Sequence, residues 1–239
     1  MPTTVYRKAL EGFLTKKIDW VADSVVGLLV DTAAYGIAVS GITFSGGQAT
    51  VTTSSAHGLA TGDPVVLTAV VGTASLNSEF GTVEVLSATQ FRFAFTASSP
   101  TYTGGGRLIR IGADTFLADI PAGARIATSS ALTSKTATGG SARAGTTLFA
   151  SPTGTSCEAF VLYQDTGSAA TSRLILYSDD AKGGNQEGYT WFLEAVRDGD
   201  KLVGRWSVAT DDVQPGGGVF VGKVVGDDRI DGLWTDTQR

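Results

Sequence analysis

His57 and Cys157 are the side chains best suited to nucleophilic or acid–base chemistry, and each is the only residue of its kind in the 239-residue chain. A Ser-His-Asp or Cys-His site would therefore have to centre on His57. Because His57 lies in the turn sequence Ala-His-Gly, we expect its ring to hydrogen-bond the local backbone instead. Cys157 is expected to be a small buried residue of a strand at 156–163, and a single cysteine forms no internal disulfide. The sequence therefore predicts no catalytic residue at either position.

Metal and cofactor sites are not predicted either. One His and one Cys, 100 residues apart, do not supply the ligands that zinc needs. The acidic pairs at 179–180, 211–212 and 227–228 lack the alternating ligands and final Glu of a calcium loop, which favours solvated turns. The triple glycines at 104 and 216 lack the Lys-Ser or Lys-Thr of a phosphate loop. A pair of glycosidase carboxylates stays open as an alternative, although no acidic pair stands in an apolar setting.

Composition places the chain among turn-rich β proteins. It has 31 Gly, 9% aromatic residues and 17% charged residues, with a net charge of −5. There is no polycationic surface to neutralise phosphates, so nucleic acid is not an expected partner. The longest apolar run, at 25–30, is far shorter than a membrane span, and residues 1–16 lack the apolar core of a signal peptide. We therefore expect no membrane partner and folding in a cytoplasm.

The N-terminal region predicts a short helix followed by a buried strand. Tyr6, Leu10, Phe13 and Leu14 have the i, i+4, i+7, i+8 spacing of one helix face. This spacing predicts an amphipathic helix over 4–15. Residues 24–31 have a continuous apolar middle, which is typical of a strand covered on both faces.

Alternating hydrophobicity dominates residues 35–107. The clearest run places Phe91, Phe93 and Phe95 on one face of a strand, because side chains in a strand alternate with period two. Similar alternation occurs at 49–53 and 66–70, and turn signals separate the runs about every ten residues. This spacing predicts a small sandwich or barrel of about five or six strands.

The next segments predict a central hairpin reached through a less defined region. Residues 127–147 are rich in Ser, Thr and Ala, and are either exposed strands or a loosely ordered arm. Two apolar runs, 157–163 and 173–177, predict the hairpin. Residues 179–188 are charged and glycine-rich, and are expected to be a linker.

The last fifty residues contain one β-hairpin written twice, 28 positions apart. The copies break at the turn dipeptides Asp198-Gly199 and Gly226-Asp227. In the second strand of each copy a glycine stands between two large apolar residues on one face, with Trp206 and Trp234 at equivalent positions. We expect an apolar face that either the same chain or a neighbouring subunit covers. The candidate contact residues are Phe192, Leu202, Trp206, Phe220, Ile230 and Trp234.

Three short segments share their order and spacing with a known family. They are Ile-Asp-Trp through Leu-Val-Asp within 18–31, Phe-Leu-Ala-Asp-Ile-Pro at 116–121, and Phe-Val-Leu-Tyr-Gln-Asp-Thr-Gly at 160–167. Together they resemble a family of small structural proteins of tailed bacteriophages, found among head or decoration proteins and in the head-to-tail region. The likeness covers about residues 1–36 and 107–180, and it implies a structural role without enzymatic activity.

The intervening segment resembles a second unit. Ala-His-Gly-Leu-Ala-Thr-Gly-Asp at 56–63, with Leu76-Asn77 and Phe91, is similar to a small β module that recurs as an insert in phage structural proteins. The module is also similar to an accessory subdomain of ubiquitin-activating enzymes, so the likeness implies no ubiquitin chemistry. We therefore predict a core from residues 1–39 and 107–184, an inserted module at 40–106 and a duplicated-hairpin element at 185–239.

The expected fold is mainly β: a β-sandwich-like core with a short N-terminal helix, an inserted barrel or sandwich, and a C-terminal meander. The expected function is that of a non-enzymatic virion protein, assembled in the host cytoplasm as a homo-oligomer. Its expected partners are other virion proteins, namely the major capsid protein or portal and tail proteins. The alternative is a fibre or adaptor that contacts a host surface glycan, and a weaker one is a glycan hydrolase. Aromatic rows exposed on the insert or hairpins would favour the fibre; aromatics buried against another subunit would favour the structural role.

Overall fold

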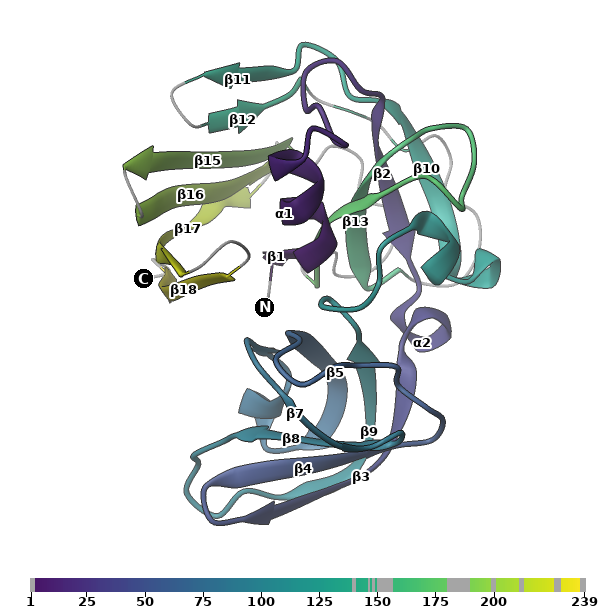
Figure 1. Ribbon diagram of the computed structural model, residues 1–239, viewed down its shortest axis with the longest axis vertical. Coiled ribbons are helices and arrows are strands. Elements are labelled where there is room, and N and C mark those ends of the chain that lie inside the picture. Colours follow the sequence, from purple (N-terminus) through teal and green to yellow (C-terminus); the bar gives the residue numbers. More distant parts are fainter. Residues whose placement is uncertain are drawn as a thin grey trace.

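A computed structural model of the chain describes residues 3–138, 141–145, 147, 149, 157–179, 190–198, 201–210, 213–225 and 229–236. At Ser141 and in the last four of these ranges, only the backbone is described. The fold is mainly β with a short N-terminal helix, as the sequence predicts, and its strands form three sheets of five, seven and six strands (Figure 1). The predicted linker at 179–188 lies outside the described residues except for Asp179.

The five-stranded sheet is built from chain segments that lie before and after the predicted module in the sequence. Every neighbouring pair is antiparallel. The central strands are buried on both faces, as their continuous apolar runs predict. The predicted central hairpin is confirmed by the pairing of Val161 with Tyr177. In order across the sheet, the strands are β1 (Thr3–Val5), β14 (Leu174–Ser178), β13 (Ala159–Gln164), β2 (Val25–Val30) and β10 (Arg125–Ala131).

The N-terminal helix is shorter than the sequence predicts. Helix α1 covers Arg7–Leu14, because the residues before it pair with β14 as strand β1. The predicted face is also partly wrong: Leu14 is 65% exposed, whereas Ala9 and Gly12 are buried. The small residues face inward because the chain turns back closely on the helix, and a Cβ at Gly12 would lie 2.7 Å from Ile18 Cδ1.

A polar scaffold holds the Phe-Leu-Ala-Asp-Ile-Pro segment against this sheet. The Asp119 carboxylate accepts hydrogen bonds from the backbone N–H groups of Thr115 and Phe116, each at 2.8 Å. The Arg125 guanidinium donates to the carbonyls of Leu117 and Ile120. Two short 3₁₀ turns result, at Leu117–Asp119 and Ala122–Ala124.

The seven-stranded sheet occupies residues 37–109 and curls around its own core (Figure 1). The end of the sheet contacts its beginning, because Gly62 N–H donates to Val83 O at 2.7 Å and Val83 N–H donates to Asp63 O at 3.1 Å. Its strands, in order across the sheet, are β6 (Glu79–Phe80), β5 (Val65–Gly72), β9 (Tyr102–Ile109), β3 (Ile37–Ser45), β4 (Gln48–Thr53), β8 (Gln90–Ala94) and β7 (Glu84–Ser87). Seven strands are present where the sequence predicts five or six, since β6 is only two residues long.

Strand β5 joins the two cores. The sequence predicts half-buried alternation here, but the first four residues of β5 are all buried. Val65 and Leu67 belong to the core of the seven-stranded sheet, whereas Val66 belongs to the core of the five-stranded sheet. Both faces of β5 are therefore covered. Side chains on one face pack into one core and side chains on the other face pack into the second core.

The chain enters and leaves the seven-stranded sheet at neighbouring positions. Ile37 at the start of β3 pairs with Leu108 near the end of β9, as expected for an inserted segment. Gly105 and Gly106 allow β9 to approach both neighbouring strands closely, since a Cβ at Gly105 would lie 2.7 Å from Ala69 O in β5 and one at Gly106 would lie 3.2 Å from Val39 Cβ in β3. The glycines at 104–106 have positive φ values of 145°, 69° and 98°, so the triple glycine serves strand geometry.

The six-stranded sheet contains the duplicated hairpins. Both predicted hairpins are present, but Asp198 pairs with Lys201 and is therefore not a turn residue. In part of 127–147, strands replace the alternative of a loose arm. The strands, in order across the sheet, are β11 (Thr136–Thr138), β12 (Ser141–Arg143), β15 (Thr190–Asp198), β16 (Lys201–Thr210), β17 (Val213–Val225) and β18 (Arg229–Asp236).

Gly27 in β2 provides a sharp test of the packing. A Cβ there would lie 2.8 Å from Cε2 of Phe160 and 3.0 Å from Cζ of Phe149, two rings that meet edge to face. We expect Gly27→Ala to lower the free energy of unfolding by about 1 to 3 kcal/mol, because the buried rings must move. Urea unfolding measures this change.

Gly41→Ala in β3 is the matched control, because no atom lies within 4 Å of its added Cβ. We expect Gly41→Ala to leave the urea midpoint unchanged or to raise it slightly. Equal midpoints for the two variants would contradict the described packing around Gly27.

Candidate functional site

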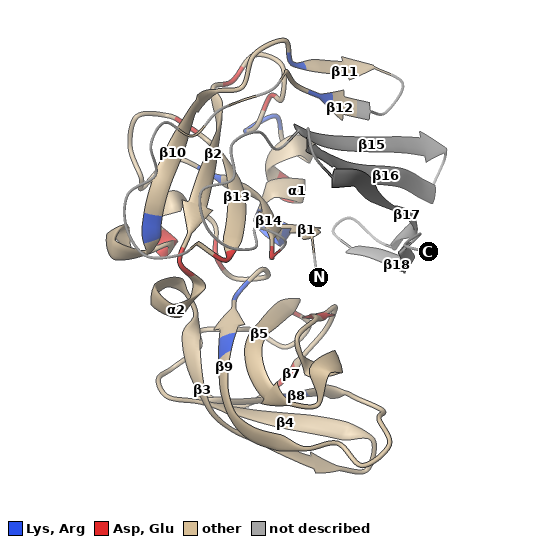
Figure 2. Ribbon diagram, turned by 180° about the vertical axis from the view of Figure 1, so that it is seen from behind, with Lys and Arg blue, Asp and Glu red and all other residues tan. Residues whose placement is uncertain are grey.

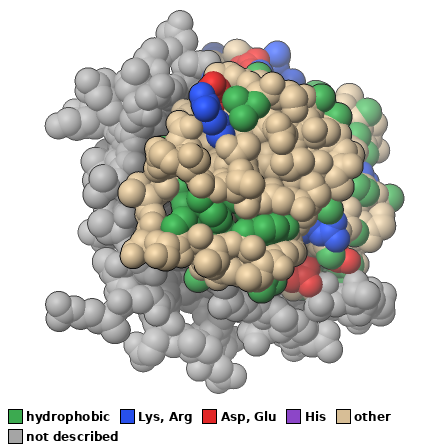
Figure 3. Space-filling model, turned by 90° about the horizontal axis from the view of Figure 1, so that it is seen from below, with side chains coloured by type: hydrophobic (Ala, Val, Ile, Leu, Met, Phe, Trp, Pro, Cys, Tyr) green, Lys and Arg blue, Asp and Glu red, His purple; other side chains and the backbone are tan. Residues whose placement is uncertain are grey.

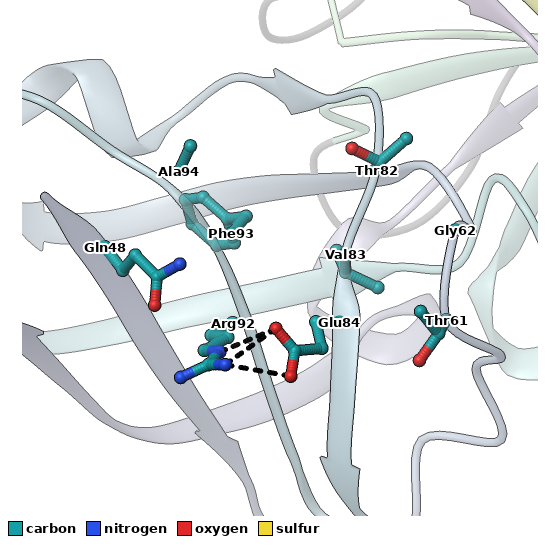
Figure 4. A pocket seen from close by; sticks show the side chains of 9 residues that line it. All are labelled: Gln48, Thr61, Gly62, Thr82, Val83, Glu84, Arg92, Phe93 and Ala94. Carbon is teal, nitrogen blue, oxygen red and sulfur yellow. Dashed lines mark hydrogen bonds and ion pairs between the residues drawn. The ribbon is translucent and has the colours of Figure 1, made fainter.

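A shallow pocket lies on the seven-stranded sheet where β4, β7 and β8 meet the loop before β5 (Figure 4). Its volume is about 350 Å³. Figure 4 shows the Arg92 and Glu84 side chains facing one another, with Nε–Oε2 and Nη2–Oε1 distances of 2.8 and 2.9 Å. The lining residues are Gln48, Thr61, Gly62, Thr82, Val83, Glu84, Arg92, Phe93 and Ala94.

The chemistry of this pocket is limited. The hydrogen bond from Arg92 lowers the pKa of Glu84, so the pair is ionised and its charges offset each other. The pocket therefore offers neither a general acid or base near neutral pH nor a free cation for an anionic ligand. In the part of the chain that the structure describes, no three His, Cys, Asp or Glu side chains gather as metal ligands.

His57 is a structural residue of the same sheet. Its Nδ1 accepts a hydrogen bond from Leu59 N–H at 3.0 Å, which confirms the predicted bond to the local backbone. The ring is 1% exposed and meets Phe91 edge to face, with 5.5 Å between ring centroids. The Nε2 atom has no hydrogen-bond partner among the described residues. A ring with this burial cannot reach a substrate.

Cys157 precedes β13 and is only partly buried, so the expectation of a buried strand residue is wrong. Burial still raises the pKa of its thiol, which keeps the less reactive protonated form.

The most connected polar site lies where the two described cores meet. Tyr6 Oη and Tyr35 Oη are 3.0 Å apart, and Tyr35 Oη donates to Asp114 Oδ2 at 2.7 Å. Asp114 Oδ1 lies 2.6 Å from Arg110 Nη2. Tyr6 immediately precedes α1, Tyr35 ends α2 (Thr32–Tyr35), and Arg110 and Asp114 follow β9. The chain of bonds therefore ties the entry and exit of the seven-stranded sheet to the N-terminus.

Burial controls the protonation of this network. Asp114 is 2% exposed and Tyr6 is fully buried. Burial raises the pKa of Asp114 to about 7, against the opposing effects of Arg110 and the Tyr35 hydrogen bond. Burial also raises the pKa of Tyr6 and of Tyr35 well above their usual range. The tyrosines stay protonated, and the hydroxyl groups act as structural hydrogen-bond partners.

Two further contacts bridge the cores beside this network. The Arg7 guanidinium forms an ion pair with Asp63 Oδ1 at 3.1 Å, and Thr4 Oγ1 donates to Glu79 Oε1 at 3.0 Å. Sequence analysis missed the roles of Asp63, Glu79 and Asp114. Asp63 has a local signal in its Thr-Gly-Asp-Pro turn, and Arg110 stands four residues before Asp114. The partners Arg7, Thr4 and Tyr35 lie at least 56 residues away in the sequence.

The predicted contact residues fall in the six-stranded sheet, where only the backbone is described. Trp206 pairs with Gly218, and Phe220 pairs with Trp234. By register, five of the six candidates share one face: Leu202, Trp206, Phe220, Ile230 and Trp234.

Phe192 does not share this face, and its predicted role as a contact residue stays a prediction. Phe192 pairs with Ser207, so its register position belongs to the opposite face. The two hairpins differ in register by one residue because two residues connect Asp198 to Lys201, whereas three connect Val225 to Arg229. The predicted equivalence of the tryptophans is wrong: Trp206 lies in the inner strand β16 and Trp234 in the edge strand β18.

Comparison with known proteins finds no matching family model, no matching curated protein and no matching solved structure. In the described part of the chain, no helix has the length and apolar character needed to cross a membrane. In the described chain, positions of Lys and Arg and positions of Asp and Glu are distributed over several segments of the ribbon (Figure 2).

Tyr35→Phe tests the buried network. The variant loses the hydroxyl that donates to Asp114, so we expect the free energy of unfolding to fall by about 1 to 3 kcal/mol. The loss should be larger at pH 8 than at pH 5, because the pKa of Asp114 is about 7 and the lost bond favours its ionised form. Denaturant unfolding at the two pH values measures the difference.

Tyr102→Phe is the control, because that half-buried hydroxyl donates only to the backbone carbonyls of Gly105 at 2.9 Å and Val39 at 3.4 Å among the described residues and contacts no carboxyl group. We expect a smaller loss without pH dependence. A Tyr35→Phe loss that is no larger than the Tyr102→Phe loss would argue against the network.

Proposed function

We propose that the chain is a non-enzymatic structural protein of a tailed bacteriophage particle, present in many symmetric copies on the capsid, at a vertex or in the head-to-tail region. Its partners in this proposal are other virion proteins, which it meets during assembly in the host cytoplasm. The role depends on surfaces that bind neighbours and on a rigid scaffold that holds them.

The observation that carries the proposal is the spatial grouping of the three segments with the phage-family likeness. The first supplies β2 and the third supplies β13, which pair along their lengths. The second segment contacts the connection after β13, because Leu117 N–H donates to Ser172 O at 2.7 Å and Phe116 bridges to Arg173. The first segment lies more than 80 residues before the other two, yet all three form one unit, which supports the likeness to one family.

The polar groups of the described residues also fit a structural role. His57, Tyr6 and Asp114 are buried and bonded within the protein, while the exposed pocket has a charge pair that is internally neutralised. Side chains of this kind stabilise a fold and offer no accessible acid, base or nucleophile.

The inserted sheet gives no support to recognition of sugars by stacking on an aromatic row. Phe91 is fully buried and Phe93 is 4% exposed, and Phe93 stacks on Phe80 with 3.8 Å between ring centroids. Seen from below, the surface is mostly backbone and polar atoms around a narrow apolar band (Figure 3). The phenylalanine row therefore serves the core of its own sheet and offers no face for stacking on sugar rings, so it does not support the host-binding alternative.

Trp206→Ala and Trp234→Ala test the proposed contact face. If a neighbouring virion protein covers this face, we expect each variant to melt like the native protein and to be depleted from gradient-purified particles. If the same chain covers the face, we expect lower melting temperatures, since truncating a buried Trp costs about 3 to 5 kcal/mol. Quantitative mass spectrometry of particles and thermal melting measure the two outcomes.

Phe192→Ala is the matched control, because its register position is on the opposite face. We expect this variant to enter particles at the native level. No change in stability or incorporation for either Trp variant would rule out the face as a contact, and absence of the native chain from purified particles would refute the proposed function.

A further inference from the structure

The outer edge of β18 differs from the other edges of the described sheets. An edge strand presents unpaired backbone N–H and C=O groups, and proteins protect such edges by keeping them short or irregular. The other edge strands are protected in this way: β1, β6 and β11 have two or three residues each, and β7 and β10 have irregular registers. Strand β18 has eight residues, contains no proline and pairs with β17 without a shift of register. Among the described residues, no strand pairs with its outer edge.

The inner strands of the same sheet show how a short sequence pattern pairs with itself. The Gly-Arg-Trp tripeptide at 204–206 in β16 runs antiparallel to Gly-Val-Phe at 218–220 in β17. In this register the glycine of each tripeptide is opposite the aromatic residue of the other. A glycine opposite an aromatic residue is a favourable cross-strand arrangement, because a ring can cover the space that the missing side chain leaves. Two Gly-x-aromatic tripeptides therefore complement one another in an antiparallel pair.

Strand β18 contains a third tripeptide of this kind, Gly-Leu-Trp at 232–234. Its pairing with β17 follows a different pattern, because Gly232 is opposite Gly222 and Trp234 is opposite Phe220. Within the described chain, the third tripeptide therefore lacks the glycine–aromatic pairing that joins the other two. It lies in the edge strand, where a further strand could supply that pairing.

We propose that β18 pairs antiparallel with β18 of a second copy of this chain, about a two-fold axis through Leu233. The six-stranded sheets of the two copies thereby join into one continuous sheet. This inference concerns the free chain, and it is independent of the proposed virion role.

Symmetry limits the registers that such a pair can adopt. A two-fold axis that reverses a strand against its own copy stands perpendicular to the sheet, so each face of the sheet continues on the same side. Opposing residues must therefore share a face, and one residue lies opposite its own copy. With Leu233 at the axis, Gly232 is opposite Trp234 of the second copy, and Trp234 is opposite Gly232 of that copy. This register reproduces the glycine–aromatic pairing of β16 with β17.

The neighbouring registers fit less well. With Asp231 at the axis, two aspartates oppose each other, and like charges directly opposite are destabilising. With Gly232 at the axis, glycine opposes glycine and no glycine–aromatic pair forms. With Trp234 at the axis, Gly232 is opposite Asp236 and the overlap of the two strands is shorter. The Leu233 register is therefore the one that the sequence of β18 supports.

Substitutions of Thr235 test both the dimer and its register. With Leu233 at the axis, Thr235 is opposite Asp231 of the second copy, whereas within its own chain it is opposite Val219. We therefore expect Thr235→Lys to lower the dissociation constant of the dimer and Thr235→Asp to raise it, each roughly fivefold, because the symmetric dimer contains this pair twice. Sedimentation equilibrium of the full chain measures the constant. Because one strand pair is a small interface, we expect a native value on the order of 100 μM.

Thr138→Lys and Thr138→Asp are the matched controls, because Thr138 is an exposed residue of β11, the strand at the opposite edge of the sheet. Both controls should leave the dissociation constant unchanged, and circular dichroism checks that all four variants keep the native fold. Amide hydrogen exchange of the native chain decides the question even if a Thr235 variant does not fold. Amides of β18 should gain protection as the protein concentration rises, whereas amides of β11 should not.

Three results would overturn the proposal. The first is a native chain that stays monomeric up to about 1 mM; protection of β18 that then appears only in assembled particles would assign the edge to a different virion protein. The second is a dimer whose dissociation constant is the same in both Thr235 variants, which would place the contact elsewhere. The third is the reverse order of the two variants, which is expected with Gly232 at the axis because Thr235 is then opposite Arg229.

Discussion

The hydrogen bond between Tyr35 and Asp114 is the interaction on which the junction of the described sheets depends. Asp114 is 2% exposed, and a buried carboxyl group without partners costs several kcal/mol of stability. Its partners come from the segment that enters the seven-stranded sheet and from the segment that leaves it. Satisfying one buried group therefore fixes where the inserted sheet begins and ends, and Tyr6 ties both points to the N-terminus.

The same junction explains how the seven-stranded sheet is attached to the five-stranded sheet. Ile37 pairs with Leu108, so the two crossings of the chain lie next to each other and disturb the five-stranded sheet little. Strand β5 adds apolar contact, because Val66 packs into the core of the other sheet. Two sheets with separate cores thus share one interface that combines apolar burial with a few polar bonds.

Local patterns in the sequence predicted the elements well where the hydrophobic pattern of the segment itself decides its structure. The apolar runs that became β2 and β13–β14 and the alternation around Phe91 required no knowledge of distant residues. Prediction failed where distant contacts decide the outcome: β1 replaced the start of the helix by pairing with β14, and β5 is buried on both faces by a second core. The register of the repeated hairpins depends on connections that differ in length by one residue. No local sequence pattern marks Glu79 as a residue of the junction.

The central claim is the proposed structural role in a virion, and a symmetry-averaged density map of a particle whose genome carries the gene for this chain would test it most directly. The account predicts repeated copies of the five-stranded sheet bound to a capsid, portal or tail protein, with the seven-stranded sheet held at the described junction. Density for every repeated component of the particle without this chain among them would contradict the account.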